Sequence, residues 1–227
     1  MAMRDQAIQT RRKILEAAAM VFDRDGYLGA TITEVFKKAG VTKGALYFHF
    51  QSKEGLALGV LDEQREIAIP PQPIRLQEMI DCGQVLAERL HRDLLIRAGV
   101  RLSLDQNAQC LDQGFAFLSW SRRNKALLDA AKEQGELLPH ISTSEIAELC
   151  VGSFAGLQLM SSALSDYTDL PERLSSFHRH LMPSIATPAV LASLDLSTGR
   201  GKAVLAQTRE AEARAAGEAD GKTPVSA

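Results

Sequence analysis

A short run of small and polar residues near the N-terminus has the composition and spacing to contact a polyanion. Thr42, Lys43 and Gly44 open a predicted short helix, and Tyr47 lies one turn beyond Lys43 on the same side. A lysine can reach a phosphate or the edge of a guanine. Small side chains let the first turn of a helix approach a phosphate closely. Lys53, at the start of the following predicted helix, can hold a further phosphate, so the run indicates a nucleic-acid contact surface.

The alternative for this run is an ordinary stretch of protein structure. Leu46 and Phe50 lie four residues apart, and we expect both to pack inward. Phe48 is compatible with either a core or a surface position. For the polar residues, His49 included, an ordinary solvated helix face remains the competing interpretation.

The other chemistry-bearing residues do not form a catalytic or metal-binding pattern. No nucleophile elbow, phosphate loop or paired metal-ligand spacing occurs. His178 and His180 are two residues apart and point to different sides of a helix. The cysteines have no CxxC pair, which argues against a structural zinc site and fits a reducing cytoplasm. We therefore expect no enzyme activity, no metal and no cofactor. The residues considered are His49, His91, His140, His178, His180, Cys82, Cys110 and Cys150.

Three predicted helices position the first run. Apolar residues at helical spacing predict a helix over residues 6–25, which Gly26 ends. Thr31 and Glu34 form a capping-box pattern in which the threonine hydroxyl accepts an N–H and the glutamate reaches back. The second helix begins near Ile32 and ends at Gly40. The segment from residue 39 to residue 42 then has the length and the glycine of a helix-turn-helix connection.

The remaining chain is also predicted to be helical, which makes the fold all-α. A proline-rich break over residues 70–73 separates two groups of helices. We predict a helix-turn-helix DNA-binding domain over residues 1–53, a helical-bundle ligand-binding and dimerisation domain over 54–196, and a disordered or frayed tail over 197–227. The predicted helices beyond the first three cover 53–69, 75–97, 100–106, 114–134 and 143–165, with one opening at Pro171 and a short one ending near 196.

Charge is distributed unevenly along the 227 residues. The net charge is only −2, but residues 1–53 hold nine lysines and arginines against five acidic residues. The remaining residues carry an excess of negative charge, so one end of the chain suits contact with phosphates. No signal segment and no apolar run long enough to span a bilayer were identified, which predicts a soluble cytoplasmic protein.

The segment 143–165 is apolar on most of its circumference, which predicts burial on two sides. We expect one side to face the domain core and the other to face a second subunit, with Gly152 and Gly156 permitting close helix approach. Ser153 and Gln158 are polar within this helix, either as locally satisfied groups or as ligand contacts. The only tryptophan, Trp120, is by itself most simply a core residue.

The stretch TITEVFKKAGVTKGALYFHFQSKE, residues 31–54, closely resembles the TetR family of bacterial repressors. Together with the first helix, the similarity covers about residues 8–60, and the YxHFxxKE ending is a specific part of the family signature. The resemblance implies that the helix over 43–49 is the recognition helix of a dimeric repressor. The DNA contacts that it implies are Thr31, Thr33, Thr42, Lys43, Gly44, Ala45, Tyr47, His49 and Lys53.

A narrower similarity, to the γ-butyrolactone autoregulator receptors of Streptomyces and related actinomycetes, runs to about residue 196. It includes RAGVRLSLDQ at 97–106, AKEQGELLPH at 131–140 and VGSFAGLQ at 151–158. This resemblance implies release from palindromic operator DNA by a butyrolactone or butenolide, control of antibiotic genes, and a pocket lined by Trp120. The ligand contacts expected are Gln64, Leu86, Phe117, Trp120, Ser153, Phe154 and Gln158.

Two further readings of the sequence remain open. A TetR-type regulator of efflux or metabolism would share every feature of residues 1–53 and differ only in its pocket. A receptor homologue that no longer binds lactones would respond to an antibiotic instead. We expect homodimerisation through the helix over 143–165 and the one after it in every case.

Overall fold

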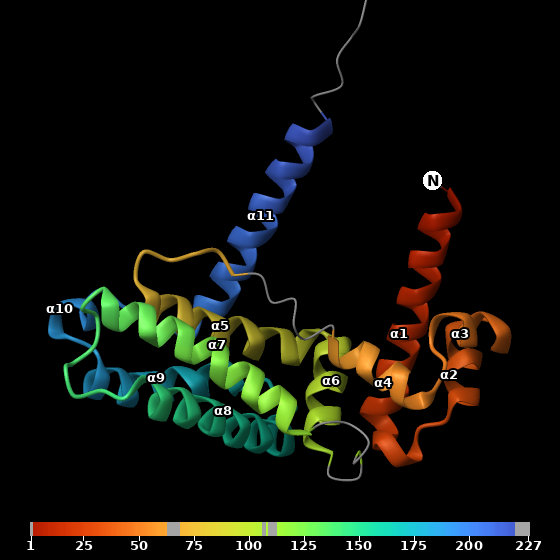
Figure 1. Cartoon of the computed structure of the whole chain (residues 1–227), viewed down its shortest axis with the longest axis horizontal. Helices are drawn as coiled ribbons and strands as arrows, with labels where there is room; N and C mark the ends of the chain where they lie inside the picture. The colour runs from red at the N-terminus through yellow and green to blue at the C-terminus, as the bar shows by residue number, and fades with distance from the viewer. Residues whose placement is uncertain (1, 63–68, 106–107, 109–112, 221–227) are drawn as a thin grey trace, which may run out of the picture. The chain divides into compact units, whose positions relative to one another are not determined.

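The computed structural model describes residues 2–62, 69–105, 108 and 113–220, and its elements are the helices α1 to α11 (Figure 1). An isolated bridge between Leu137 and Ala186 is the one β-type pairing among the described residues. The predicted all-α class is therefore confirmed. The chain divides into two compact units, which are described separately below. Unit 1 comprises Met1–Glu66 and Arg89–Trp120, and unit 2 comprises Ile67–Glu88 and Ser121–Ala227.

Unit 1 is built around α1. Its helices are α1 (Ala2–Gly29), α2 (Ile32–Ala39), α3 (Lys43–His49), α4 (Lys53–Asp62) and α6 (Leu94–Leu104), with the ends of two helices shared with unit 2. Residues from α1, α3, α4 and α6 share one apolar core, and α6 packs on both α1 and α4. The core includes Leu15, Phe22, Leu46, Leu56 and Leu102. This compact unit is larger than the predicted 1–53 module, because α4 and α6 complete its core.

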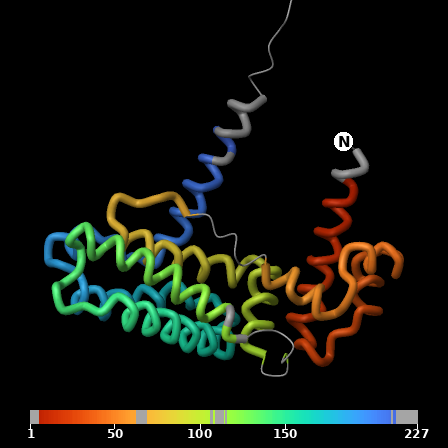
Figure 2. The backbone as a smooth tube through the Cα atoms, viewed as in Figure 1, coloured from red at the N-terminus to blue at the C-terminus, as the bar shows by residue number. Residues whose placement is uncertain are grey.

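Local capping sets the helix boundaries in the first part of unit 1. The Thr31 hydroxyl accepts the Glu34 N–H at 3.2 Å, and Gly40 ends α2 in the left-handed region at φ 65°. Gly26, at φ 69°, interrupts regular helix within α1. Only the Thr31 half of the predicted capping box forms. The Glu34 carboxylate does not reach back to Thr31 but accepts a hydrogen bond from Arg24. Figure 2 follows the backbone through these turns.

The predicted helix over 75–97 is wrong in its extent. Asp93 interrupts it by capping α6, because its carboxylate accepts the N–H groups of Leu95 at 3.0 Å and Ile96 at 3.4 Å. Arg92 therefore ends α5 (Arg75–Arg92), and α6 covers the segment in which only a short helix was expected.

Unit 2 has a core drawn from four helices. These are the first part of α5, the last part of α7 (Gln113–Glu133), α8 (Thr143–Ser165) and α9 (Leu170–Ile185). Figure 1 shows them running alongside one another, and α10 (Pro188–Leu191) follows α9. The core includes Ile80 of α5, Leu128 of α7, Ala147 of α8, and Met182 of α9. The buried Glu136 carboxylate accepts the N–H groups of Arg75 and Leu76 at 2.8 and 2.9 Å, which caps the start of α5.

We predicted that the tail from residue 197 is either disordered or a frayed helix, and residues 200–220 form a helix, α11 (Arg200–Asp220). Arg200 anchors this helix through two 2.7 Å hydrogen bonds to the carboxylate of Asp81, whose side chain is fully buried. The next residue, Gly201, packs directly on the backbone of α5 at Gln84. Residues 221–227 lie outside the described part of the chain.

Candidate functional site

The end of unit 1 that holds α2 and α3 presents the predicted contact residues. The Thr42 hydroxyl accepts the Ala45 N–H at 3.1 Å, which fixes the first turn of α3. Its O–H proton is left to donate outward. Thr31 caps α2 in the same way, and both threonines are exposed. Thr33, on the first turn of α2, is exposed as well.

Lys43 and Tyr47 form a pair on the outer side of α3. The Lys43 ammonium lies 5.8 Å from the centre of the Tyr47 ring, and Tyr47 is 39% exposed. Gly44 is exposed, and the Thr42 hydroxyl, at 4.0 Å, is the one atom that an added Cβ would approach. Leu46, one residue before Tyr47, is fully buried as predicted. This side of α3 therefore offers a cation, a phenol and an open backbone.

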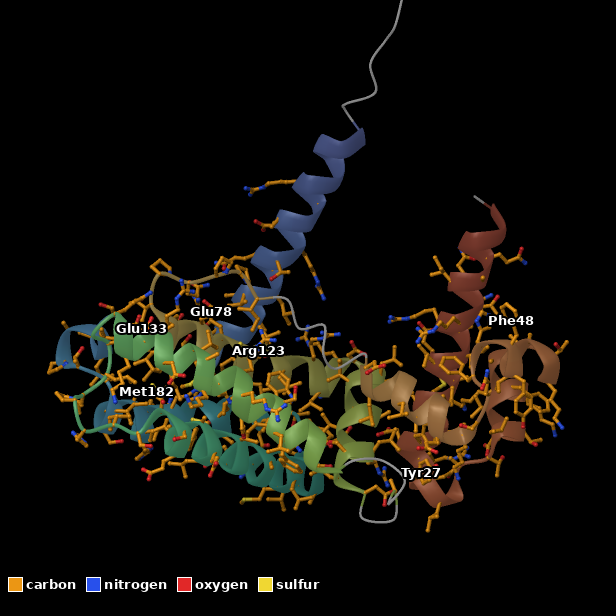
Figure 3. All side chains as sticks on the ribbon, in the orientation of Figure 1. Tyr27, Phe48, Glu78, Arg123, Glu133 and Met182 are labelled. Atoms are coloured by element: carbon orange, nitrogen blue, oxygen red, sulfur yellow. The ribbon has the colours of Figure 1, made fainter. Side chains whose placement is uncertain are left out.

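Phe48 answers a question that the sequence left open. Phe48, labelled in Figure 3, is 80% exposed, the largest exposed fraction among the large apolar residues described. Its ring packs edge-on against the ring of His49 with 5.1 Å between centres. Phe50, two residues later, is buried at 5% exposure, as expected. Phe48 therefore occupies a surface position and not a core position, on a helix that packs through Leu46.

Lys53 is held in place by the C-terminal end of α1. Its ammonium donates to the Leu28 carbonyl at 3.2 Å and lies 4.7 Å over the ring of Tyr27 (Figure 3). These contacts use part of the donor capacity of an ammonium group, which has three N–H bonds. Lys53 is thus a positioned cation at the start of α4. The contact with Tyr27 was not predicted from the sequence.

The predicted ligand contacts fall in different parts of the chain. Leu86 and Gln158 are buried in unit 2, whereas Ser153 and Phe154 of α8 are partly buried there. The other described contacts belong to the part of α7 that lies in unit 1. Of these, Phe117 is 37% exposed and Trp120 is partly buried. Gln64 lies outside the described residues.

One side of α8 is apolar and exposed. Leu159 and Leu164 are 65% and 69% exposed, and Leu149 and Met160 are each 50% exposed. Gly152 and Gly156 have no neighbouring atoms within 4 Å of an added Cβ. We call these six residues the α8 face.

The α8 face is opposite the buried side of α8. That buried side contains Ala147, Cys150, Gln158 and Ser161. By length and composition alone α8 could cross a membrane, which is weak evidence because the core helices of soluble proteins pass the same test. Among the described residues, the α8 face is thus an exposed apolar surface.

The described cysteines are not poised for nucleophilic chemistry. Burial raises the pKa of the Cys150 thiol to about 12, and burial likewise raises the pKa of Cys82 despite the nearby Arg123 guanidinium. Both thiols are therefore protonated at neutral pH. Cys110 lies outside the described residues, and within those residues no group of three or more potential metal ligands occurs.

A glycine-linked helix pair with an exposed cationic and aromatic second helix defines a helix-turn-helix DNA-binding protein. The family model for "Bacterial regulatory proteins, tetR family" matches residues 14–60. The A-factor receptor protein of Streptomyces griseus is 40% identical over 229 residues, covering 97% of this chain and 81% of the receptor. The chain belongs to the TetR family, whose members are DNA-binding regulators rather than enzymes.

Solved structures extend the similarity through unit 2. Full-length TylP, a TetR regulator from Streptomyces fradiae, has a TM-score of 0.82 and 45% identity, over 88% of this chain and 98% of that protein. A γ-butyrolactone receptor described as ArpA-like has a TM-score of 0.69 and 27% identity, over 87% and 98% of the two chains. This protein is a ligand-responsive repressor of the TetR type, a cytoplasmic regulator that binds operator DNA as a dimer.

Proposed function

We propose that this repressor leaves its operator when a γ-butyrolactone or butenolide-type molecule binds, and that it controls antibiotic or other secondary-metabolite genes. One observation carries the proposal. The similarity to the A-factor receptor covers 97% of the chain, so it includes the sensor helices as well as the reading helices. A regulator that shared only the DNA-binding module would match over residues 14–60 and diverge beyond them.

The proposed operator contacts are the exposed groups of α2 and α3. Lys43 supplies a charge and Tyr47 a phenol on the same side of α3, while Thr42 has a hydroxyl proton to donate. Phosphate contacts would position α3 in the major groove, and Phe48 would give an apolar contact to a thymine methyl or a sugar. Lys53 would hold a phosphate beside the groove while Tyr27 keeps its ammonium in place.

A second copy of the chain is the proposed partner of the α8 face. An isologous dimer buries the same patch on both subunits. The α8 face suits this because large apolar side chains flank two glycines at which helices can approach closely. We infer that α8 and α9 together make the interface, since α9 packs against α8 within the same subunit.

The proposed mechanism is a shift between two arrangements of the dimer. Half-sites of a palindrome that are one DNA turn apart are separated by about 34–36 Å, so both recognition helices fit only at a matching spacing. A ligand that prefers an arrangement with another spacing lowers the affinity for the operator. The size of the effect is set by the difference between the ligand's affinities for the two arrangements. When bound to its operator, the protein would associate with the nucleoid.

The test combines operator selection with a gel shift. A sequence selected from random duplexes by the purified protein serves as operator, and a synthetic γ-butyrolactone is titrated into the complex while Trp120 fluorescence is followed. We expect release of DNA at ligand concentrations that also change the fluorescence. Tight operator binding that no butanolide or butenolide alters would overturn the ligand assignment. Release of the operator by an antibiotic instead would support the other sensor class.

A further inference from the structure

Polar side chains of α5 and α9 meet inside unit 2. The Gln84 side chain donates from Nε2 to the Ser175 hydroxyl at 3.0 Å, and both residues are fully buried. His178, one turn after Ser175 on α9, is 4% exposed. Its ring lies beside Gly83, where an added Cβ would be 3.9 Å from His178 Cε1. Gln84, Ser175 and His178 therefore occupy one level of the unit.

Gln158 of α8 joins the same level. Consecutive helices α8 and α9 pack against each other after a short turn, at which the Ser161 hydroxyl donates to the Asp169 carboxylate (Figure 1). Gln158 lies seven residues before the end of α8 and His178 eight residues after the start of α9, which places the two within about one helical turn of each other along the pair. Gln158 is 5% exposed, so it belongs to the interior of the pair. We call Gln84, Gln158, Ser175 and His178 the polar layer.

The polar layer contains unsatisfied hydrogen-bonding groups. Three buried side-chain atoms in the described part of the chain have no hydrogen-bond partner there, and all three belong to this layer: Gln84 Oε1, Gln158 Oε1 and His178 Nδ1. Buried polar atoms are almost always paired in folded proteins. Two of the three are amide oxygens, which can only accept, so the missing partner must have a hydrogen to donate.

The state of His178 narrows the chemistry of that partner. Burial lowers the pKa of His178 to about 4, so the imidazole is neutral at physiological pH. A neutral imidazole has one donor and one acceptor nitrogen. A hydroxyl group donates its one hydrogen to an amide oxygen and accepts a hydrogen bond from Nδ1–H. A carboxylate has no hydrogen to donate, and a cationic group would bring a charge into a site where burial already disfavours the charged form of His178.

We propose that the polar layer binds a hydroxyl group, which donates to Gln84 or Gln158 and pairs with His178 Nδ1. The hydroxyl belongs either to the effector, in which case the inference rests on the proposed function, or to a buried water, and the chemistry is the same. Phe154 lies one turn from Gln158 on α8, and both are among the predicted ligand contacts. The layer therefore includes one residue, Gln158, and adjoins another, Phe154, that were predicted from the sequence to contact the ligand.

The first arm of the test uses two synthetic γ-butyrolactones that differ only in a side-chain hydroxyl. Calorimetry on the full-length protein should give at least about ten-fold tighter binding of the hydroxylated compound, a difference of one good hydrogen bond. The preference should fall to within about two-fold in Gln158→Leu or in Gln84→Met, and the variant that loses it identifies the amide oxygen that accepts from the hydroxyl. Gln207→Leu, at an exposed position on α11, is the control and should keep the full preference.

The second arm detects water in the unliganded protein by nuclear magnetic resonance. Cross-peaks from a long-lived water to the amide protons of Gln84 or Gln158, or to the His178 ring, would support the layer with water as its hydroxyl. Equal binding of the two lactones together with no such cross-peaks would overturn the proposal. If neither lactone binds, the proposed function fails, and the water cross-peaks alone then decide whether the layer holds a hydroxyl.

Discussion

The carboxylate of Asp105 accepts a hydrogen bond from the backbone N–H of Tyr27, with 2.8 Å between Oδ2 and N. The two residues are 78 positions apart, and the bond joins the end of α6 to the bend in α1. Gly26 makes the approach possible, because a Cβ there would lie 3.2 Å from the same carboxylate oxygen. Tyr27 in turn carries the Lys53 ammonium on its ring. The end of α6 thus supports a cation of the proposed operator surface.

Asp105→Ala should destabilise unit 1. The substitution leaves the Tyr27 N–H without this acceptor in a partly buried site, and such a loss costs about 1–3 kcal/mol. Urea unfolding should show a lower midpoint with an unchanged slope, and operator affinity should fall because Lys53 loses its support. Asp105→Asn keeps an oxygen acceptor and should lose less stability. Equal stability of wild type and Asp105→Ala would contradict this role.

Gly201→Ala should detach the first turn of α11. The new Cβ would lie 2.4 Å from the Gln84 carbonyl oxygen, a backbone atom that cannot turn aside. We expect a loss of roughly 1–3 kcal/mol in the free energy of unfolding, with faster proteolysis after residue 200 as the second readout. Gly199→Ala is the matched control because nothing lies within 4 Å of its Cβ. Equal losses in both variants would show that the close packing does not matter.

The sequence predicted those parts of the fold that are set by contacts between residues close together in the chain. Thr31, Gly40 and Thr42 act within a few residues of themselves, and the helix-turn-helix boundaries were predicted from them correctly. The sequence left disorder and helix open for the tail, because α11 is held by a pair between Arg200 and Asp81, which are 119 residues apart. The composition of the tail shows that it has few large apolar residues, but it does not show that Arg200 pairs with a distant carboxylate.

The candidate site shows the same limit. Helical periodicity predicted that α8 is apolar on two sides, but it did not separate the exposed Leu149 and Leu164 from the buried Cys150. Which side is buried depends on where α9 packs, and that contact is not encoded in the period of one helix. The position of Phe48 was ambiguous because it also depends on packing between helices. Phe48 is exposed because α3 packs on the core through Leu46.

Gly44→Ala should separate folding from operator binding. An added Cβ meets only the Thr42 hydroxyl, at 4.0 Å, so the helix tolerates it. Alanine in a helix is favoured over glycine by up to about 1 kcal/mol, so Tm should be unchanged or slightly raised. Operator affinity should nevertheless fall by about ten-fold, because the methyl group holds the backbone of α3 away from the phosphates.

Two results would speak against this role of Gly44. Unchanged gel shifts for Gly44→Ala would remove its backbone from the proposed contacts, and a lowered Tm would point to a structural role. Lys43→Ala gives the electrostatic comparison. It should weaken binding and reduce the slope of log affinity against log salt by about 0.9, as expected for one phosphate contact.

Leu159→Asp should convert the dimer to a monomer. Leu159 is 65% exposed on the α8 face, so the folded subunit tolerates a carboxylate there, whereas a paired α8 face would have to bury one from each copy. Sedimentation velocity should show the mass of one chain, and operator affinity should drop in parallel. Leu118→Asp, at a 55% exposed leucine on α7, is the control and should remain dimeric. A dimeric Leu159→Asp would exclude the α8 face as the interface.

The stability of the protein should depend on pH through His178. Its pKa is lowered to about 4 in the folded state, against 6.5 for a free histidine, so between these values the unfolded chain binds a proton that the folded chain does not. The free energy of unfolding contributed by this group is therefore fully present above pH 6.5, falls as the pH drops, and levels off below about pH 4. The total loss is about 3 kcal/mol. Chemical denaturation measured from pH 7.5 to pH 4 should show this slope, and His178→Gln should flatten it, whereas His140→Gln, at an exposed position, should leave it unchanged. A slope that persists in His178→Gln would assign the acid sensitivity to other groups.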